Sequence, residues 1–153
     1  MSIDWTLYLI TDPELAGGRD QVVPIVQEAV RGGATVVQLR DKEVSDEEVE
    51  ATARDLLEVL GDVPLFINDR VEVAAKVGCH LHIGQDDMDL SQARALLGPD
   101  KLIGLSVGTR EELDAIDPQD APDVIGIGPV HSTATKKNAP AGIGAEAARR
   151  LAT

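Results

Sequence analysis

The chain has 153 residues, of which 43% are hydrophobic and 27% are charged, a composition typical of one globular domain and not of a disordered chain. It carries 27 acidic and 14 basic residues, for a formal net charge of −13 at pH 7, which excludes broad electrostatic attraction to nucleic acid or anionic lipid. Aromatic residues make up only 2%, too few to form stacking platforms for bases.

Three further features lead us to expect a soluble cytoplasmic protein. No apolar run approaches the ~20 residues that a membrane span needs, and residues 1–5 lack the pattern of an export signal. The lone cysteine, Cys79, cannot form an internal disulfide, which fits a reducing compartment. The acid excess fits a salt-adapted protein and an ordinary acidic protein equally well. We expect small-molecule ligands, no nucleic-acid or membrane partner, and leave a homo-oligomer open.

Short β-branched runs alternate with stretches of helical period along the whole chain. The predicted strand–helix pairs are, in chain order, 7–10 with 22–30, 36–39 with 45–60, 65–67 with 71–77, 81–83 with 89–97, 102–105 with 111–116, and 124–127 with 145–151. Gly32-Gly33 ends the first helix, Ser45-Asp46-Glu47-Glu48 is a capping box, and Asp89 is a helix N-cap. The pattern indicates about six repeated βα units.

Repeated βα units indicate a parallel sheet with right-handed crossovers, since each helix returns the chain to the same end of the sheet. The predicted strands are nearly all apolar, as expected where both faces are covered. A doubly wound open sheet and a (β/α) barrel both fit. A complete barrel takes roughly 200 residues or more, so a barrel of this length is about two units short. We find no linker and predict one domain over residues 1–153.

Polar residues gather where the predicted strands end, and in parallel α/β folds ligands bind at the carboxyl ends of strands. Alternation places Gln38 and Arg40 on the same face of an extended segment. The other strand-end residues that we single out are Asp41, Lys42, Asn68, Asp69, Asp87, Ser106, Thr133, Thr135 and Lys136.

This set suits a diphosphate that is bridged by a metal ion and held by basic side chains. Mg²⁺ is usually bound by one or two carboxylates together with substrate phosphates, and Asp69 and Asp87 come from different strand ends. Arg40, Lys42 and Lys136 supply positive charge. Each residue also has a plain structural explanation, because Asn-Asp after a strand is often a turn and a loop lysine is usually solvated. His80 and His82 share a strand face, but no third metal ligand is evident.

The chain resembles the thiamine phosphate synthase family. The resemblance is carried by five segments in the family's order, which are Gln38-Leu39-Arg40-Asp41-Lys42, Ile67-Asn68-Asp69-Arg70, His82-Ile83-Gly84-Gln85-Asp86-Asp87-Met88, Ile103-Gly104-Leu105-Ser106, and Gly126-Ile127-Gly128-Pro129 with Thr133-Ala134-Thr135-Lys136-Lys137. It covers essentially the whole chain.

The resemblance implies a TIM-type (β/α)₈ barrel, here an incomplete one of about six units, and a cytoplasmic transferase of thiamine biosynthesis. Such an enzyme joins hydroxymethylpyrimidine diphosphate to hydroxyethylthiazole phosphate with Mg²⁺, releasing diphosphate. It further implies that residues of the matching segments contact the substrates, that Arg40, Ser106 and Lys136 are catalytic, and that Asp69 and Asp87 bind the metal. The implied substrate-binding residues are Gln38, Leu39, Arg40, Asp41, Lys42, Asn68, Ser106, Thr133, Ala134, Thr135 and Lys136.

The sequence departs from the family pattern at several points and keeps two other functions open. It stops at Thr153, before the seventh and eighth strands, which leads us to expect a truncated synthase. Gly108 stands where the family usually has histidine, and His131-Ser132 where an aromatic residue and proline are common. The alternatives are a relative of thiazole tautomerases and a truncated, non-catalytic binder of phosphate ligands.

Overall fold

The computed structural model describes residues 3–133 and 141–153. Its strands are β1 (Tyr8–Ile10), β2 (Val36–Leu39), β3 (Leu65–Asn68), β4 (His80–Ile83), β5 (Ile103–Val107) and β6 (Val124–Ile127). Its α-helices are α1 (Val22–Arg31), α2 (Asp46–Leu60), α3 (Val71–Val77), α4 (Leu90–Leu97), α5 (Arg110–Asp114) and α6 (Gly144–Leu151), and a short 3₁₀ helix, η1 (Arg19–Gln21), precedes α1. Every predicted strand and helix is present.

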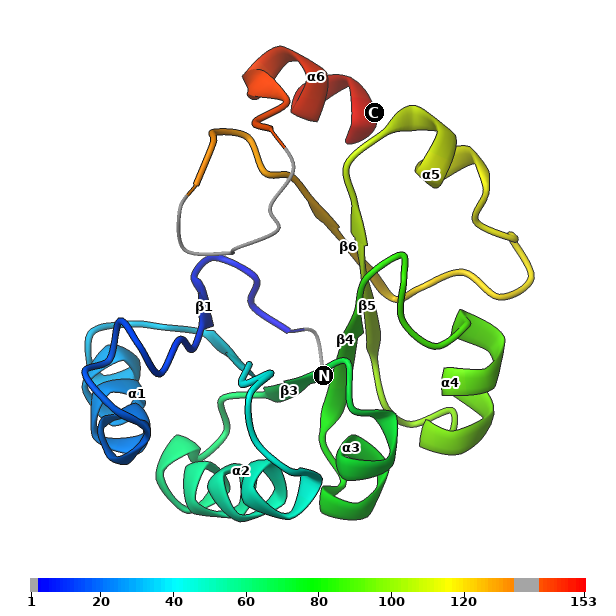
Figure 1. Ribbon diagram of the computed structural model, residues 1–153. Helices are drawn as coiled ribbons and strands as arrows, with labels where there is room; N and C mark the ends of the chain where they lie inside the picture. Colours follow the sequence, from blue (N-terminus) through cyan, green and yellow to red (C-terminus); the bar gives the residue numbers. More distant parts are fainter. Residues whose placement is uncertain (1–2, 134–140) are drawn as a thin grey trace.

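The six strands form one parallel sheet in the order in which they occur along the chain, β1-β2-β3-β4-β5-β6. The sheet is curled into part of a barrel, and helices α1 to α4 follow its outer side (Figure 1). An order that never reverses is the topology of a (β/α) barrel, whereas a doubly wound sheet has a switch point. The incomplete barrel predicted from the sequence is therefore confirmed.

The hydrophobic core lies between the outer face of the sheet and the helices. Strand residues such as Leu39, Ile67 and Leu81 pack there against Val49 and Leu56 of α2, and none of these five is more than 3% exposed. Because neighbouring residues of a strand point to opposite faces, alternate residues of the same strands face the inside of the curl. The sheet thus has a helix-covered outer face and an inner face of different composition.

The helix caps explain where the helices begin. Ser45 accepts a hydrogen bond from the backbone N–H of Glu48 at 3.3 Å, and Glu48 accepts one from the backbone N–H of Ser45 at 3.2 Å, which completes the predicted capping box. Asp89 caps α4 through Ser91 and Gln92, as predicted. A second capping box, between Thr109 and Glu112, starts α5 one residue before the predicted position.

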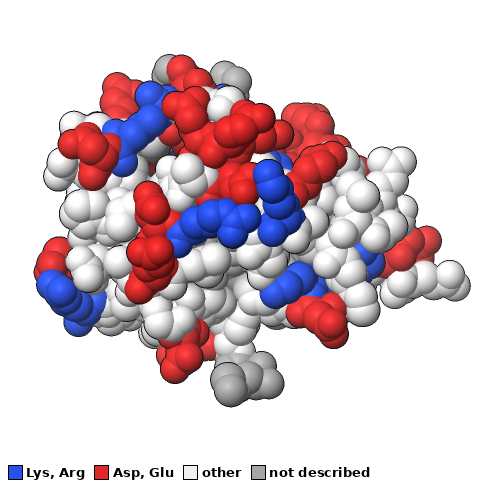
Figure 2. Space-filling model, turned by 90° about the horizontal axis from the view of Figure 1, so that it is seen from below, with Lys and Arg blue, Asp and Glu red and all other residues white. Residues whose placement is uncertain are grey.

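Acidic side chains outnumber basic ones on the face shown in Figure 2, where the basic side chains lie against acidic neighbours. Glu50 of α2, for example, pairs with Arg54 at 2.8 Å and with Lys76 of α3 at 2.5 Å. Among the described residues, no helix combines the length and the apolar character needed to cross a bilayer.

Candidate active site

The inner face of the sheet combines aromatic and polar side chains. Gln38 of β2 is in register with Phe66 of β3, which is in register with His80 of β4. Gln38 is 2% exposed, and its amide nitrogen donates a hydrogen bond to the Tyr8 hydroxyl at 3.0 Å. Burial raises the pKa of Tyr8 to about 12, although the hydrogen bond with Gln38 opposes the shift. Trp5 covers the Phe66 ring, with 5.8 Å between the ring centroids.

Ser106 and His82 meet further along the same face. The Nε2 atom of His82 lies 2.9 Å from the Ser106 hydroxyl, and the side chain of Gln85 donates to the Ser106 carbonyl at 2.7 Å. Two glycines make room for the imidazole. A Cβ atom at Gly104 would lie 2.4 Å from His82 Nδ1, and one at Gly126 would lie 3.3 Å from His82 Cε1. The ring therefore lies across β5 and β6 where side chains would block it.

Two carboxylates meet at the carboxyl ends of β3 and β4. Burial, and then a hydrogen bond with Asp69, hold the pKa of Asp87 above its usual value. Asp87 also accepts a hydrogen bond from the backbone N–H of Gly84 at 2.6 Å. Asp69 has a left-handed backbone conformation with φ of 63°, which aspartate tolerates better than most residues. The backbone N–H of Asp69 donates to the His82 carbonyl at 2.9 Å, which fixes the loop beside β4.

Lys42, from the loop between β2 and α2, joins this acid pair. Its ammonium group lies 2.7 Å from Asp69 Oδ2. Arg70 holds the same loop, because its guanidinium donates to the carbonyl oxygens of Val44 at 2.7 Å and Asp41 at 3.2 Å and also pairs with Asp46. The loop that carries Lys42 is thus fixed against the turn that carries Asp69.

Arg40 and Asn68 complete the strand-end group, and neither side chain forms a hydrogen bond or ion pair with another residue within 3–133 and 141–153. The backbone of Arg40 is held by Thr11, a buried residue after β1. The Arg40 N–H donates to the Thr11 hydroxyl at 2.9 Å, and the Thr11 N–H donates to the Gln38 carbonyl at 2.9 Å. Thr11 thereby keeps β2 extended through Arg40, so that Gln38 and Arg40 stay on one face.

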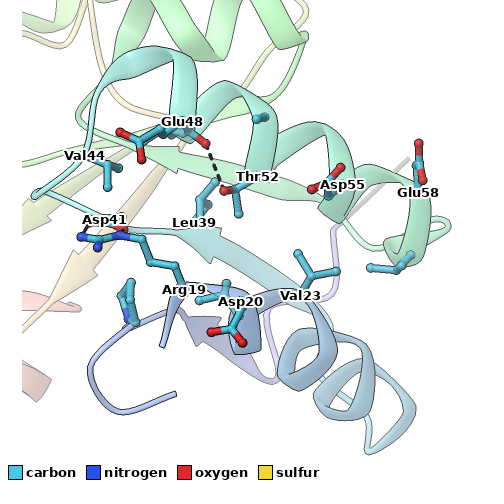
Figure 3. A pocket seen from close by; sticks show the side chains of 15 residues that line it. Arg19, Asp20, Val23, Leu39, Asp41, Val44, Glu48, Thr52, Asp55 and Glu58 are labelled. Atoms are coloured by element: carbon cyan, nitrogen blue, oxygen red, sulfur yellow. Dashed lines mark hydrogen bonds and ion pairs between the residues drawn. The ribbon is translucent and has the colours of Figure 1, made fainter. Parts of the chain in front are cut away.

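Leu39 and Asp41 of the predicted substrate-binding set point elsewhere. The Leu39 side chain belongs to the helix-facing core and so points away from the inner face. Both residues line a groove between α1 and α2, at whose mouth Arg19 pairs with Asp41 at 2.7 Å (Figure 3). Burial would raise the pKa of Asp41, but hydrogen bonds from Arg19 and the Glu43 backbone hold it below its usual value.

The remaining predicted residues follow β6. Thr133 is exposed, whereas Ala134, Thr135 and Lys136 lie outside the described residues. Their predicted contacts with substrate stay predictions.

The donor set at the strand ends fits a hexacoordinate hard cation. In the part of the chain that the structure describes, no three histidine, cysteine or acidic side chains group as a complete metal site. Mg²⁺ does not need such a group, because it keeps several waters and takes one or two carboxylates together with phosphate oxygens. Asp69 and Asp87 fit this requirement, since they follow the paired strands β3 and β4 and their side chains interact with each other, so that they could share one ion.

Sequence reasoning did not identify the residues that hold the site in place. Thr11, Arg19 and Arg70 act through the backbone or through other side chains, and Tyr8 and His82 contact Gln38 and Ser106. Thr11 and Arg70 lie at or near strand ends, like the predicted site residues, so their positions in the sequence could have pointed to them. Their contacts join residues 22 to 30 positions apart in the sequence, and such contacts depend on how the folded sheet brings the strands together.

Comparison with known proteins gives a consistent result. A family model described as thiamine monophosphate synthase matches residues 7–153. The thiamine-phosphate synthase of Azorhizobium caulinodans is 49% identical over 146 residues, which cover 94% of this chain and 68% of that protein. The thiamine biosynthesis multifunctional protein ThiED of Corynebacterium efficiens is 45% identical over 158 residues, and here the match spans 97% of this chain but only 21% of the relative.

A solved structure shares both fold and sequence with the chain. The thiamine phosphate pyrophosphorylase from Pyrococcus furiosus superposes with a TM-score of 0.79 at 32% identity. The superposition covers 95% of this chain and 68% of that protein. The chain therefore spans about two thirds of these single-function relatives and about a fifth of the multifunctional one.

Proposed function

We propose, because the chain belongs to the thiamine monophosphate synthase family, that it binds hydroxymethylpyrimidine diphosphate at the strand-end site and transfers the pyrimidine methylene group to hydroxyethylthiazole phosphate. The products are thiamine monophosphate and diphosphate. The observation that carries the proposal is the meeting of Asp69, Asp87 and Lys42 at one edge of the sheet, with Arg40 directly after the neighbouring strand β2. A protein of net charge −13 needs such a local arrangement to accept a diphosphate.

The reaction exchanges one bond for another. The C–O bond between the pyrimidine methylene carbon and the diphosphate breaks, and its electron pair leaves with the diphosphate oxygen. The thiazole nitrogen lone pair then forms the new C–N bond. No strong general base is needed, so the main task of the protein is to stabilise the charge that grows on the leaving group and to hold two substrates in line.

The residues of this chain divide that task. Arg40 offers a planar fork of N–H donors that suits phosphate oxygens, and Lys42 offers a mobile point charge. Gln38, Asn68 and Ser106 line the inner face beside them and can bind the uncharged pyrimidine ring through amide and hydroxyl groups. When bound at Asp69 and Asp87, Mg²⁺ would supply further charge neutralisation at the leaving diphosphate. The family resemblance assigns Lys136 to the pyrimidine diphosphate, and Thr133 and Thr135 to the phosphate of the thiazole substrate.

The site suggests a direct test, which is the replacement Asp69→Asn. Asparagine keeps the size of the side chain and tolerates the left-handed backbone, so the change removes charge without adding strain. We expect the Mg²⁺-dependent affinity for inorganic pyrophosphate to fall about tenfold or more, while the free energy of unfolding changes by less than about 1 kcal/mol. Calorimetric titration and urea denaturation measure the two effects.

Asp55→Asn is the matched control, because Asp55 is an exposed residue of α2 without a described partner. It should leave pyrophosphate affinity unchanged. Equal losses in Asp69→Asn and Asp55→Asn would contradict the metal role. Binding of the pyrimidine diphosphate without turnover would favour a phosphate-ligand binder, and turnover of a thiazole phosphate alone would favour a tautomerase.

We further propose that the chain is one domain and works in the cytoplasm.

A further inference from the structure

Lys42 stands between two roles that cannot be filled at the same time. Its ammonium group lies 2.7 Å from Asp69 Oδ2, where it compensates one charge of the carboxylate pair. The proposed function needs a divalent cation on those same carboxylates and a positive charge on the diphosphate. A metal ion on Asp69 and the ammonium group would repel each other at this distance.

The loop around Lys42 is fixed, but the side chain itself is free to move. Arg70 binds the carbonyl oxygens of Asp41 and Val44, and Arg19 binds the Asp41 carboxylate. Lys42, in contrast, forms no ion pair or hydrogen bond among the described residues apart from the ion pair with Asp69, and its side chain is 51% exposed. A four-carbon stem with an ammonium tip can therefore swing away from Asp69 while its backbone stays in place.

We propose, as an extension that rests on the proposed function, that Lys42 is a resident cation on the Asp69–Asp87 pair, and that a divalent ion displaces it and so releases it to the diphosphate. A divalent ion would outcompete one ammonium group because it carries twice the charge and could be held by both carboxylates. The released ammonium group could then pair with phosphate oxygens of the diphosphate. Lys42 thus opposes binding of the metal alone and favours binding of metal and diphosphate together.

This coupling has a sign that an ordinary substrate contact does not produce. A lysine that binds only diphosphate, and forms no ion pair with a metal-binding carboxylate, leaves the affinity for the metal alone essentially unchanged when it is removed. Displacement predicts that removing Lys42 tightens the binding of metal alone and loosens the binding of diphosphate in the presence of metal. By linkage, the cooperativity between the two ligands falls by the same factor whichever ligand is titrated first.

The variant Lys42→Met keeps the length of the side chain and removes its charge. Mn²⁺ serves as the probe for the metal, because the free ion gives a paramagnetic resonance signal that disappears on binding. We expect Lys42→Met to bind Mn²⁺ alone about twofold to fivefold more tightly than the parent chain. At saturating Mn²⁺, its affinity for inorganic pyrophosphate should fall about tenfold or more.

Lys76→Met is the matched control. Lys76 is similarly exposed, pairs with one carboxylate, that of Glu50, and lies on α3, so the variant has the same net charge as Lys42→Met. We expect both affinities to stay at the parental values. Equal tightening of Mn²⁺ in the two variants would reduce the effect to overall charge and overturn the displacement.

The remaining outcomes separate the two proposals. Unchanged or weaker Mn²⁺ binding in Lys42→Met, with weaker pyrophosphate binding, would overturn the displacement and leave the proposed function standing. A parent chain that binds neither Mn²⁺ nor pyrophosphate would overturn the proposed function and, with it, this inference.

Discussion

The two faces of the same sheet differ sharply in composition. The outer face is aliphatic, and residues such as Leu39, Ile67 and Leu81 are buried against helices. The inner face carries Gln38, Phe66 and His82, which are held by directed contacts with neighbouring side chains. Since alternate residues of each strand supply the two faces, a strand of four residues places two side chains in the helix-facing core and two on the inner face, which carries the candidate site.

Leu56→Ala tests whether the outer face is the main source of stability. Leu56 is completely buried between α2 and the sheet, so we expect the free energy of unfolding to fall by about 2–5 kcal/mol, through lost burial and the cavity that remains. Urea denaturation measures the change. Leu57, the next residue of α2, is 43% exposed, and Leu57→Ala should cost less than about 1 kcal/mol. Similar losses at both positions would contradict the assignment of the core to the outer face.

The outer face and the order of elements were predictable from sequence because they follow local patterns. Apolar runs marked the strands, and the signals at Ser45 and Asp89 marked two helix starts. The inner face was predictable only in part. The positions of Gln38, Asn68 and Asp69 at strand ends were visible in the sequence, and alternation along β2 also separates Leu39 from Gln38. The Asp41 carboxylate was harder to place, because its partner Arg19 lies 22 residues away.

Long-range contacts set the limit of such predictions. Thr11 binds the backbone of Arg40, and Arg70 binds the loop that carries Lys42. Both contacts depend on which strands are neighbours and on their register. The sequence places Lys42 and Asp69 in different loops, and only the folded sheet brings them to 2.7 Å. The sequence pattern predicted which polar residues follow the strand ends, and it left their mutual contacts open.

Titration of Tyr8 tests the inner face by a route that does not involve the outer core. Burial raises the pKa of Tyr8 from 10.0 to about 12 in the folded chain, so the folded state holds the phenol proton more tightly than the unfolded state. The stabilisation is therefore complete below pH 10 and is lost as the pH rises from 10 to 12. We expect a loss of about 2 kcal/mol over this range, measured as the difference in unfolding free energy between the parent chain and Tyr8→Phe. Parallel pH profiles for the two proteins would show that Tyr8 is not buried as the inner face requires.

The smallest effect is expected on the exposed side of α2, where neither face of the sheet takes part. Glu58 lies in the last turn, a position without any basic residue, whereas Glu47 lies in the first turn. The helix dipole favours positive charge at the carboxyl end and negative charge at the amino end, so Glu58→Lys should stabilise the chain by about 0.3–1 kcal/mol and Glu47→Lys should destabilise it by a similar amount. Both variants lower the net negative charge of −13 equally. If general repulsion among the acidic groups controlled stability, both variants would raise the free energy of unfolding. Changes of opposite sign in urea denaturation would instead show that the effect comes from the dipole of α2.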